Sequence, residues 1–538
     1  MSDHWASDEE STTRPQARPS FDLPSVCGNI LAEIPQLQTV ILSSLSKVTR
    51  LATVHALPLE LLQQCFSALA QDDLPRTTLD GVHLGWITVS HVCRAWREAA
   101  MELSMLWGRP TLALGPRWFR EMARRAGSAP LIVHCTWPYS PRPKRAGPFS
   151  PRMVRQTIIG HMDHLKELIS EPKSTICYSG LVKALILPAH SLTTIELHAF
   201  PYGAPAPFSL PTNFLGQAAP RLRKISLHGI TGQWAVSLRP FRDLLQLNIL
   251  DVGPSLTSFD DLLHILGASP RLEELCLLGV LTSWFESAGS SRRLRLPHLQ
   301  CLILDGYAAP CAELIQILDL PDTVRINLVP TYSSLDDWQL LFSALAQHFT
   351  SRLPFRRLSL IPKTFRFAME SAPYNANEPE HDLSTASSCP PLLYLECMDS
   401  KAHVIRAALG NLPYADLTEL VIADRYYDRD LWTDNLRSLK QVRYLRIEGD
   451  GFHRLACAAI VDGAEKGVDL FPQLSFLELH HTNLSSAGPL ACAALIAMLI
   501  RRKNLGSPIE RFHLTRCVIP SQVVSDLAEV VPDIVEVK

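Results

Sequence analysis

Few residues in this chain have the types and spacing that support chemistry. His161 and His164 stand three positions apart on an expected helix and could bind a metal ion, but no third ligand lies nearby in the sequence. His480 and His481 follow an expected strand, so their rings should point to opposite faces, and we expect a solvated turn there. The acidic pair Asp260-Asp261 suits the first turn of a helix. None of these groups predicts a catalytic residue, a metal site or a cofactor site.

The common catalytic and nucleotide-binding motifs are absent from the sequence. It contains no G-x-x-x-x-G-K-[ST] loop, no G-x-G-x-x-G after a strand, no H-E-x-x-H and no G-x-S-x-G. The 13 cysteines are scattered, and no two form a C-x-x-C pair. This pattern argues against a zinc module, a disulfide framework and a thioester-forming ligase. We therefore expect reduced cysteines that serve as small apolar residues, and no enzyme activity.

Composition excludes several classes of partner. The formal net charge is −2 and the pI is near 6.8, which gives no overall footprint for nucleic acid or for an anionic membrane. No stretch approaches the ~20 apolar residues of a membrane span. Residues 1–10 are polar and acidic, unlike a signal peptide. We expect an intracellular protein, in the cytoplasm, the nucleus or both.

The elements that organise the chain lie in its first fifth. Apolar residues at steps of three and four predict an amphipathic helix within residues 30–52, beginning near Pro35 and braced against the module that follows. Pro58 suits the first turn of a next helix, which the polar segment Gln71–Gly81 should end. A second helix is expected over roughly Ile87–Met101, with Trp96 and Trp107 as core.

This stretch resembles an F-box. The resemblance rests on Leu57-Pro58-Leu59-Glu60-Leu61, on Val92-Cys93-Arg94-Ala95-Trp96-Arg97 and on the closing Leu106-Trp107. More narrowly, it is similar to F-box proteins abundant in mushroom-forming (basidiomycete) fungi. The resemblance implies that the chain docks on the Skp-family adaptor of a cullin–RING ubiquitin ligase. It also implies the adaptor-binding residues, which are Leu57, Pro58, Leu61, Val89, Val92, Cys93 and Trp96.

The rest of the chain repeats the pattern L-x-x-L-x-L, which is typical of short strands followed by helical stretches. The units recur about every 22–37 residues, near the spacing of leucine-rich repeats, so we expect a solenoid whose units are stable only when stacked. A full repeat has Asn or Cys three residues after the third apolar position, and only Cys517 fits cleanly, with Thr482 and Asp450 as polar stand-ins. The strands are expected around Leu192, Leu222, Leu244, Leu272, Leu299, Val324, Phe355, Leu392, Leu417, Val442, Leu474 and Ile509, with an earlier one at Leu131-Ile132-Val133.

The expected fold class is α/β, a small helical F-box module followed by an irregular leucine-rich-repeat-like α/β solenoid. Ser371–Pro391 is expected to be a long loop, and a helix over Pro520–Val530 is expected to cap the array. The expected organisation is a disordered tail at 1–29, the amphipathic helix at 30–52, the F-box domain at 53–110, a connecting segment with a proline-rich basic loop at 111–160, and the solenoid at 161–538.

These features favour a substrate-receptor subunit of a Skp–cullin–F-box ubiquitin ligase that binds an unknown protein. A repeat-based scaffold that binds the adaptor without delivering substrates is the alternative, and an enzyme is the least favoured. The x positions of the strand pattern are candidates for target contact because they may face outward, and they include Glu196, His198, Ser226, Arg446 and Glu478.

Overall fold

A computed structural model of the chain divides into two compact units. The first comprises Met1–Pro75 with His83–Leu106, and the second comprises Arg76–Val82 with Trp107–Lys538. No helix in the described part of the chain is both long enough and apolar enough to cross a bilayer. The structure describes residues 35–44, 57–78, 81–136, 151–171, 181–199, 209–230, 234–250, 259–281, 293–330, 333–349, 355–362, 365–370, 393–397, 402–414, 416–423, 436–449, 452, 470–487 and 489–537.

The first unit is a set of small helices. Helix α2 spans Leu59–Asp72, the 3-10 helix η2 spans Gly85–His91, and helix α3 spans Arg94–Glu102. As predicted, α2 ends where the polar segment begins. Between α2 and η2 the chain forms two short paired strands, β1 (Arg76–Thr78) and β2 (Gly81–His83), which lie almost entirely in the second unit and which the sequence did not indicate.

The single helix expected over Ile87–Met101 is wrong, because the chain breaks between η2 and α3. Cys93 has extended backbone angles, φ −155° and ψ 175°. The break is supported by Arg97 on α3, whose Nε donates a 2.8 Å hydrogen bond to the carbonyl of Ser90 in η2. A carbonyl that a continuous helix would have paired internally is thus satisfied by a side chain.

The amphipathic helix expected before this module is present over residues 35–44, and the remainder of 30–52 lies outside the described residues. All ten described residues are exposed, including Leu37, Val40 and Ile41 on its apolar face. The expected bracing against the module is therefore not seen over these residues. The expected tail at 1–29 and the loops at 138–150 and 371–391 also lie outside the described residues.

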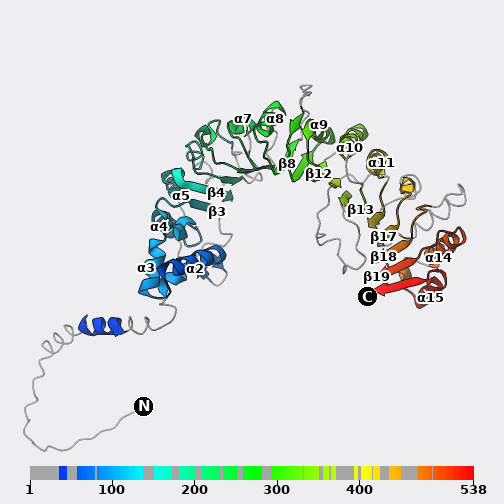
Figure 1. Cartoon of the computed structure of the whole chain (residues 1–538), viewed down its shortest axis with the longest axis horizontal. Helices are drawn as coiled ribbons and strands as arrows, with labels where there is room; N and C mark the ends of the chain where they lie inside the picture. The colour runs from blue at the N-terminus through cyan, green and yellow to red at the C-terminus, as the bar shows by residue number, and fades with distance from the viewer. Residues whose placement is uncertain are drawn as a thin grey trace, which may run out of the picture. The chain divides into compact units, whose positions relative to one another are not determined.

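The second unit is built on one long sheet with helices along one side (Figure 1). The sixteen strands follow the order β20-β19-β18-β17-β16-β13-β14-β15-β12-β10-β8-β7-β6-β5-β4-β3. A further pair of two-residue strands, β9 (Leu294–Arg295) and β11 (Leu318–Asp319), forms a separate small sheet. Most neighbours in the long sheet are parallel, with a strand-to-strand connection that passes through a helix or turn, as expected for stacked repeats.

The strands confirm the repeat pattern read from the sequence. Every expected strand is present in the structure, and β4, β14 and β20 are additional strands that were not among those expected. Their bounds are β3 Leu131–Thr136, β4 Leu165–Glu171, β5 Thr194–His198, β6 Lys224–His228, β7 Gln246–Leu250, β8 Glu274–Leu281, β10 Cys301–Gly306, β12 Arg325–Pro330, β13 Arg357–Pro362, β14 Phe365–Glu370, β15 Leu393–Cys397, β16 Glu419–Ala423, β17 Tyr444–Glu448, β18 Phe476–His480, β19 Arg511–Thr515 and β20 Asp533–Val537.

Helices follow many of the strands and cover their apolar face. The helical stretches expected between strands are present, for example as α8, α10 and α14. Within the described residues, the α-helices of this unit are α4 Pro116–Ala126, α5 Pro151–Gly160, α7 Trp234–Leu238, α8 Phe259–Gly267, α9 Ala308–Ile317, α10 Leu335–Phe349, α11 Ala402–Asn411, α13 Leu484–Ala487, α14 Pro489–Asn504 and α15 Ser521–Val530.

Stacking is held by a backbone ladder and by buried leucines. In each regular unit the first leucine of the pattern closes a turn, as when Leu222 N–H donates to Ala219 O. The next residue then bonds to the preceding unit, as when Arg223 N–H donates to Thr193 O at 2.8 Å. The later apolar positions, such as Ile225 and Leu227, are fully buried. Each unit therefore depends on its neighbour for both hydrogen bonds and apolar burial.

The array departs from a simple succession of repeats at its middle. β14 is antiparallel to both β13 and β15, and β13 continues into β16 while β15 continues into β12. The strands around Phe355 and Leu392 were expected as successive parallel units, and that order is wrong. Antiparallel partners need only a short connection, so two closely spaced strands such as β13 and β14 can pair directly.

Both ends of the array extend beyond the sequence-based expectation. At the start, β3 pairs with β4, so the sheet begins within the segment expected to be a connection. At the end, α15 matches the expected final helix, but β20 follows it and pairs in parallel with β19. The expectation that a helix closes the array is corrected, because the last element of the long sheet is an edge strand.

Polar stand-ins in the repeat turn work as expected. Cys517 Sγ donates to Leu479 O at 3.2 Å, and Thr482 Oγ1 donates to Gly449 O at 2.9 Å. Thr482 is 1% exposed, so its hydroxyl is buried in the turn and takes its hydrogen-bond partner from the protein. Asp450 lies outside the described residues.

We predict that Thr482→Val destabilises the C-terminal repeats by about 1–3 kcal/mol, because it removes the hydrogen bond that a buried hydroxyl makes to the Gly449 carbonyl of the preceding unit. Thr193→Val is the matched control, since its Oγ1 also bonds to the preceding unit, at Lys166 O, but at an exposed position. The control should cost less than about 0.5 kcal/mol. Native-state hydrogen exchange of β17–β19 measures the difference, and equal effects of the two substitutions would show that burial of this turn does not matter.

Candidate functional site

Helix α2 carries apolar residues on two faces. Leu62 and Phe66, four residues apart, are buried and form part of the core of the first unit. Leu61, Cys65 and Leu69 follow the same four-residue spacing on another face, and all three are exposed. A surface helix needs only one apolar stripe to pack, so the second stripe is not explained by folding of this chain.

The start of α2 extends this exposed surface. Pro58 precedes the first helical residue, and its carbonyl accepts hydrogen bonds from the N–H groups of Leu61 and Leu62. Leu57 and Leu59 are 39% and 43% exposed. The proline pre-sets the helix entry without a backbone donor that would need a partner. We call the exposed residues Leu57, Pro58, Leu59, Leu61, Cys65 and Leu69 the α2 edge.

A close approach of η2 to the end of α2 fixes the core of this unit. Trp86 N–H donates to Asp73 O at 2.8 Å. Gly85 has φ +57°, and a Cβ there would lie 2.4 Å from the Asp73 carbonyl oxygen, so only glycine fits. Trp86 and Ile87 are then almost fully buried. The core tryptophan of this unit is thus Trp86, which the sequence reasoning missed because a buried short 3-10 helix has no long periodicity.

Helix α3 contacts α2 through aromatic rings. Trp96 and Phe66 meet edge to face, with centroids 5.2 Å apart. Trp96 is half-buried, and among the described residues its Nε1 has no hydrogen-bond partner. Trp107 belongs to the second unit, where it is fully buried with the Arg125 guanidinium 4.3 Å from its ring centroid.

The seven residues predicted to bind an adaptor differ in exposure. Leu57, Pro58, Leu61 and Val92 are exposed, and Val92 is 60% exposed at the junction of η2 and α3. Cys93 and Trp96 are half-buried, whereas Val89 is 5% exposed and lies in the core. Leu59, Cys65 and Leu69 were not predicted, although their spacing along α2 could have indicated them.

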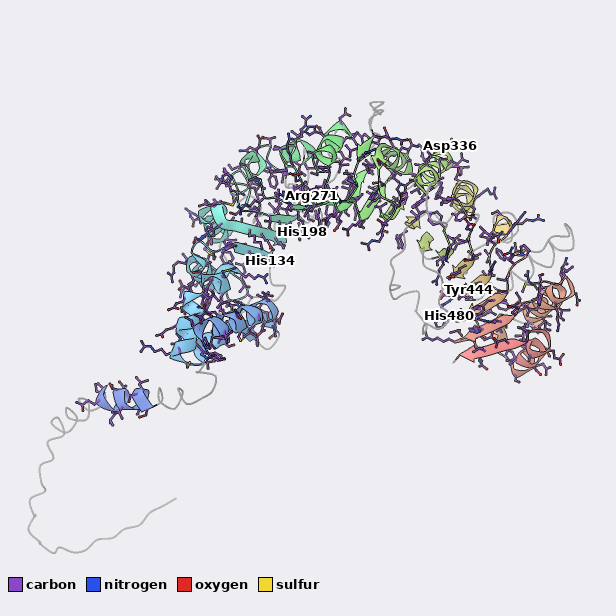
Figure 2. All side chains as sticks on the ribbon, viewed as in Figure 1. His134, His198, Arg271, Asp336, Tyr444 and His480 are labelled. Carbon is purple, nitrogen blue, oxygen red and sulfur yellow. The ribbon has the colours of Figure 1, made fainter. Side chains whose placement is uncertain are left out.

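A second candidate surface is the face of the long sheet opposite the helices. Figure 2 shows His198, Tyr444 and His480 on this strand side and Asp336 on the helix side. In β5, Ile195 and Leu197 are buried beneath the helices, so the alternating residues face the other way. Toward the N-terminal end this face is polar, with Lys224 Nζ 2.8 Å from Glu196 Oε1.

The same face is buried toward the C-terminal end. Tyr444 donates a hydrogen bond to Glu478, which also accepts one from Thr515 at 3.1 Å. Arg446 Nη2 lies 3.0 Å from Glu448 Oε1. Arg446 and Glu478 are 8% and 6% exposed, so their side chains face outward from the sheet as expected but are not open to water. Ser226 is likewise buried, while Glu196 and His198 are half-buried.

The two histidine pairs lie in different surroundings. His480 is 3% exposed and its Nδ1 lies 3.3 Å from Glu448 Oε1, so the expectation of a solvated turn is wrong for this residue. The burial of His480 was missed because the alternation of residues shows which face of the sheet a side chain lies on, and not which neighbouring residues cover it. His161 Nδ1 and His164 Nε2 are 3.0 Å apart. Within the described residues, no three His, Cys, Asp or Glu side chains gather in a way that could hold a metal ion.

Comparisons with known proteins match one short segment of the chain to a family model. Residues 54–113 match the family model described as F-box-like. No curated protein matches the chain. Nothing in these comparisons supports the narrower resemblance to proteins of mushroom-forming fungi.

Several solved structures resemble the chain at low sequence identity. One is an LRR protein of Leptospira interrogans, with 14% identity over 72% of this chain and 92% of that chain and a TM-score of 0.26. Another is an internalin of Listeria monocytogenes, with 12% identity over 66% and 88% of the two chains and a TM-score of 0.21. A third is the LRR ectodomain of the Arabidopsis receptor kinase HAESA, with 11% identity over 76% and 56% and a TM-score of 0.21.

We predict that Trp86 and Leu61 respond differently to truncation. Trp86→Ala should destabilise the first unit by about 3–5 kcal/mol, because a buried aromatic leaves a cavity. Leu61→Ala should change its stability by less than about 1 kcal/mol, because the side chain is already 44% exposed. Hydrogen exchange of the α2 amides reports both, and a large effect of Leu61→Ala would place it in the core and remove it from the α2 edge.

Residues 54–113 of the chain therefore match the F-box-like family model, and the residues after them form a long, mostly parallel sheet with helices along one side.

Proposed function

We propose that this chain is a substrate-receptor subunit of a Skp–cullin–F-box ubiquitin ligase. The observation that carries the proposal is the α2 edge, a row of exposed apolar side chains on a module that matches the F-box-like family. Exposed apolar rows beyond what folding needs mark protein-binding sites. Leu57, Pro58 and Leu61 contact the Skp-family adaptor in this proposal, and Val92 adds a contact from the end of η2.

The buried members of the predicted set act indirectly in this proposal. Val89 fills the core beneath the surface, while Cys93 and Trp96 are half-buried and can contribute part of their area to an interface. The ring contact between Trp96 and Phe66 holds α3 against α2. Truncation of these residues would therefore affect folding as well as binding, which makes them poor test positions.

The mechanism is proximity. The repeat region holds a target protein while the adaptor, through a cullin–RING ligase, supplies activated ubiquitin, so the effective concentration of the two reactants rises. The strand face of the sheet is the proposed target surface, because its N-terminal half presents half-buried polar groups such as Glu196, His198 and Lys224. In this proposal the chain makes and breaks no bond itself, and it acts in the cytoplasm or nucleus, where the ligase is found.

We predict that Leu57→Ala/Leu61→Ala weakens adaptor binding about 30-fold or more, because two central apolar anchors are each worth about 1–2 kcal/mol. Leu340→Ala/Leu505→Ala is the matched control, since both leucines are exposed but lie in the repeat region. Titration of the full chain with purified Skp adaptor gives the affinities. Absence of binding by the wild type, or equal affinities of the wild type and the α2-edge variant, would contradict the proposal.

The alternative is a scaffold that binds the adaptor without delivering its partners for degradation. We predict that partners captured by the full chain accumulate when the proteasome is inhibited, because a receptor directs their destruction. The α2-edge variant should capture the same partners without that accumulation. Partners whose levels respond to neither change would support the scaffold.

A further inference from the structure

Helices α4 and α5 pack against each other in the second unit (Figure 1). A groove lies between them. Its volume is about 640 Å³. Arginines 117, 120 and 124 line one wall from α4, and Gln156 and His161 line the other from α5 and the turn after it. The groove lies apart from the strand face, and neither the α2 edge nor the adaptor-binding proposal uses it.

The charge of these helices is strongly one-sided. α4 and α5 together contain six arginines and one carboxylate, Glu121, although the whole chain has a formal net charge of −2. Concentration of like charge in one place works against folding stability, since the charges repel. A cluster of this kind therefore calls for an explanation other than packing.

The single carboxylate is already occupied. Glu121 accepts hydrogen bonds from Arg124 at 2.7 and 2.9 Å and from Arg125 at 2.7 Å. These bonds lower the pKa of Glu121 to about 2, so it stays ionised at neutral pH. The Arg125 guanidinium is also held over the buried ring of Trp107. Glu121 carries one negative charge and already binds two arginines, Arg124 and Arg125, so it cannot neutralise the remaining arginines of the groove.

Arg117 and Arg120 remain without an acidic partner. Both side chains are exposed, and no carboxylate within the described residues forms an ion pair with either. With Arg124 they stand at positions i, i+3 and i+7, which places all three on one face of α4 along a line of about 10.5 Å. Their guanidinium groups can each take a carboxylate in a bidentate manner.

The opposite wall is polar and uncharged. Burial lowers the pKa of His161, with a further contribution from the neighbouring His164, so its imidazole is neutral at neutral pH. Thr157 directs its hydroxyl to the backbone carbonyl of Met153, while the exposed amide of Gln156 stays available at the rim. This wall can accept a peptide backbone by hydrogen bonding and adds no negative charge.

We propose that the α4–α5 groove binds an acidic segment of a partner protein. A row of arginines along a helix suits carboxylates spread along a polypeptide, whereas a compact anion such as phosphate is bound by donors that converge on one point. Nucleic acid is less favoured, because its recognition uses a broad basic surface and the chain as a whole is not basic. This binding goes beyond the proposed ligase function and can exist without it.

The test uses the full chain and a fluorescent peptide of consecutive glutamates, with binding followed by anisotropy at low ionic strength. A peptide with glutamine at every glutamate position should bind at least about tenfold more weakly, because it keeps the shape and loses the charge. Arg117→Gln/Arg120→Gln should weaken binding of the glutamate peptide about three- to tenfold, since exposed ion pairs contribute modestly. Added salt should reduce the difference in peptide affinity between the wild type and this double variant, because salt screens exposed charges.

Arg221→Gln/Arg271→Gln is the matched control, because both arginines are exposed in turns before strands of the same unit. It should leave peptide affinity unchanged. Equal binding of the glutamate and glutamine peptides, or equal loss in the two double variants, would overturn the proposal. Two further probes test the kind of partner. The proposal would also be overturned if only a glutamine peptide carrying phosphoserines bound, or if single-stranded RNA bound more tightly than the glutamate peptide. Adaptor titration with Arg117→Gln/Arg120→Gln should match the wild type, which separates this site from the α2 edge.

Discussion

The rest of the structure depends on one constraint: a single repeat cannot pair its own backbone hydrogen-bonding groups and needs its neighbours to do so. A strand such as β6 has its apolar side chains, Ile225 and Leu227, covered by its helix side, but its backbone groups are paired only by β5 and β7. Turn side chains such as Thr482 also reach a carbonyl of the preceding unit. The second unit therefore gains stability step by step along the sheet, and a long surface results from many short, similar contacts.

The first unit, in contrast to the repeats, closes its own core. Its core is closed by a few large contacts, with Gly85 allowing Trp86 to approach Asp73 and with Trp96 resting on Phe66. Those contacts consume only one face of α2, and the second apolar face is left exposed. Apolar side chains that do not pack in the core of this small module are free to contact a partner protein. This is the physical basis of the proposed adaptor contact.

The sequence predicted the parts of the fold that repeat and missed those that do not. Alternating leucines located the expected strands because the same spacing recurs, and Cys517 was correctly placed in a turn. The antiparallel β14 escaped prediction because pairing order is not encoded in the spacing of one strand. In the candidate site, motif likeness selected exposed Leu57 and Leu61 but also buried Val89, since a motif records residue type and not which side faces the core. The burial of Arg446 could not be predicted either, because the residue pattern of one strand does not show what packs over its outer face.

In the proposed complex, the exposed edge of α2 binds the Skp-family adaptor while the repeat region stays free. Hydrogen exchange of the full chain, measured by mass spectrometry with and without purified adaptor, tests it most directly. We expect added protection within residues 57–72 and around Val92, with exchange in β5–β19 unchanged. Protection confined to the repeat strands, or no change at α2 under conditions where the adaptor is bound, would contradict the account.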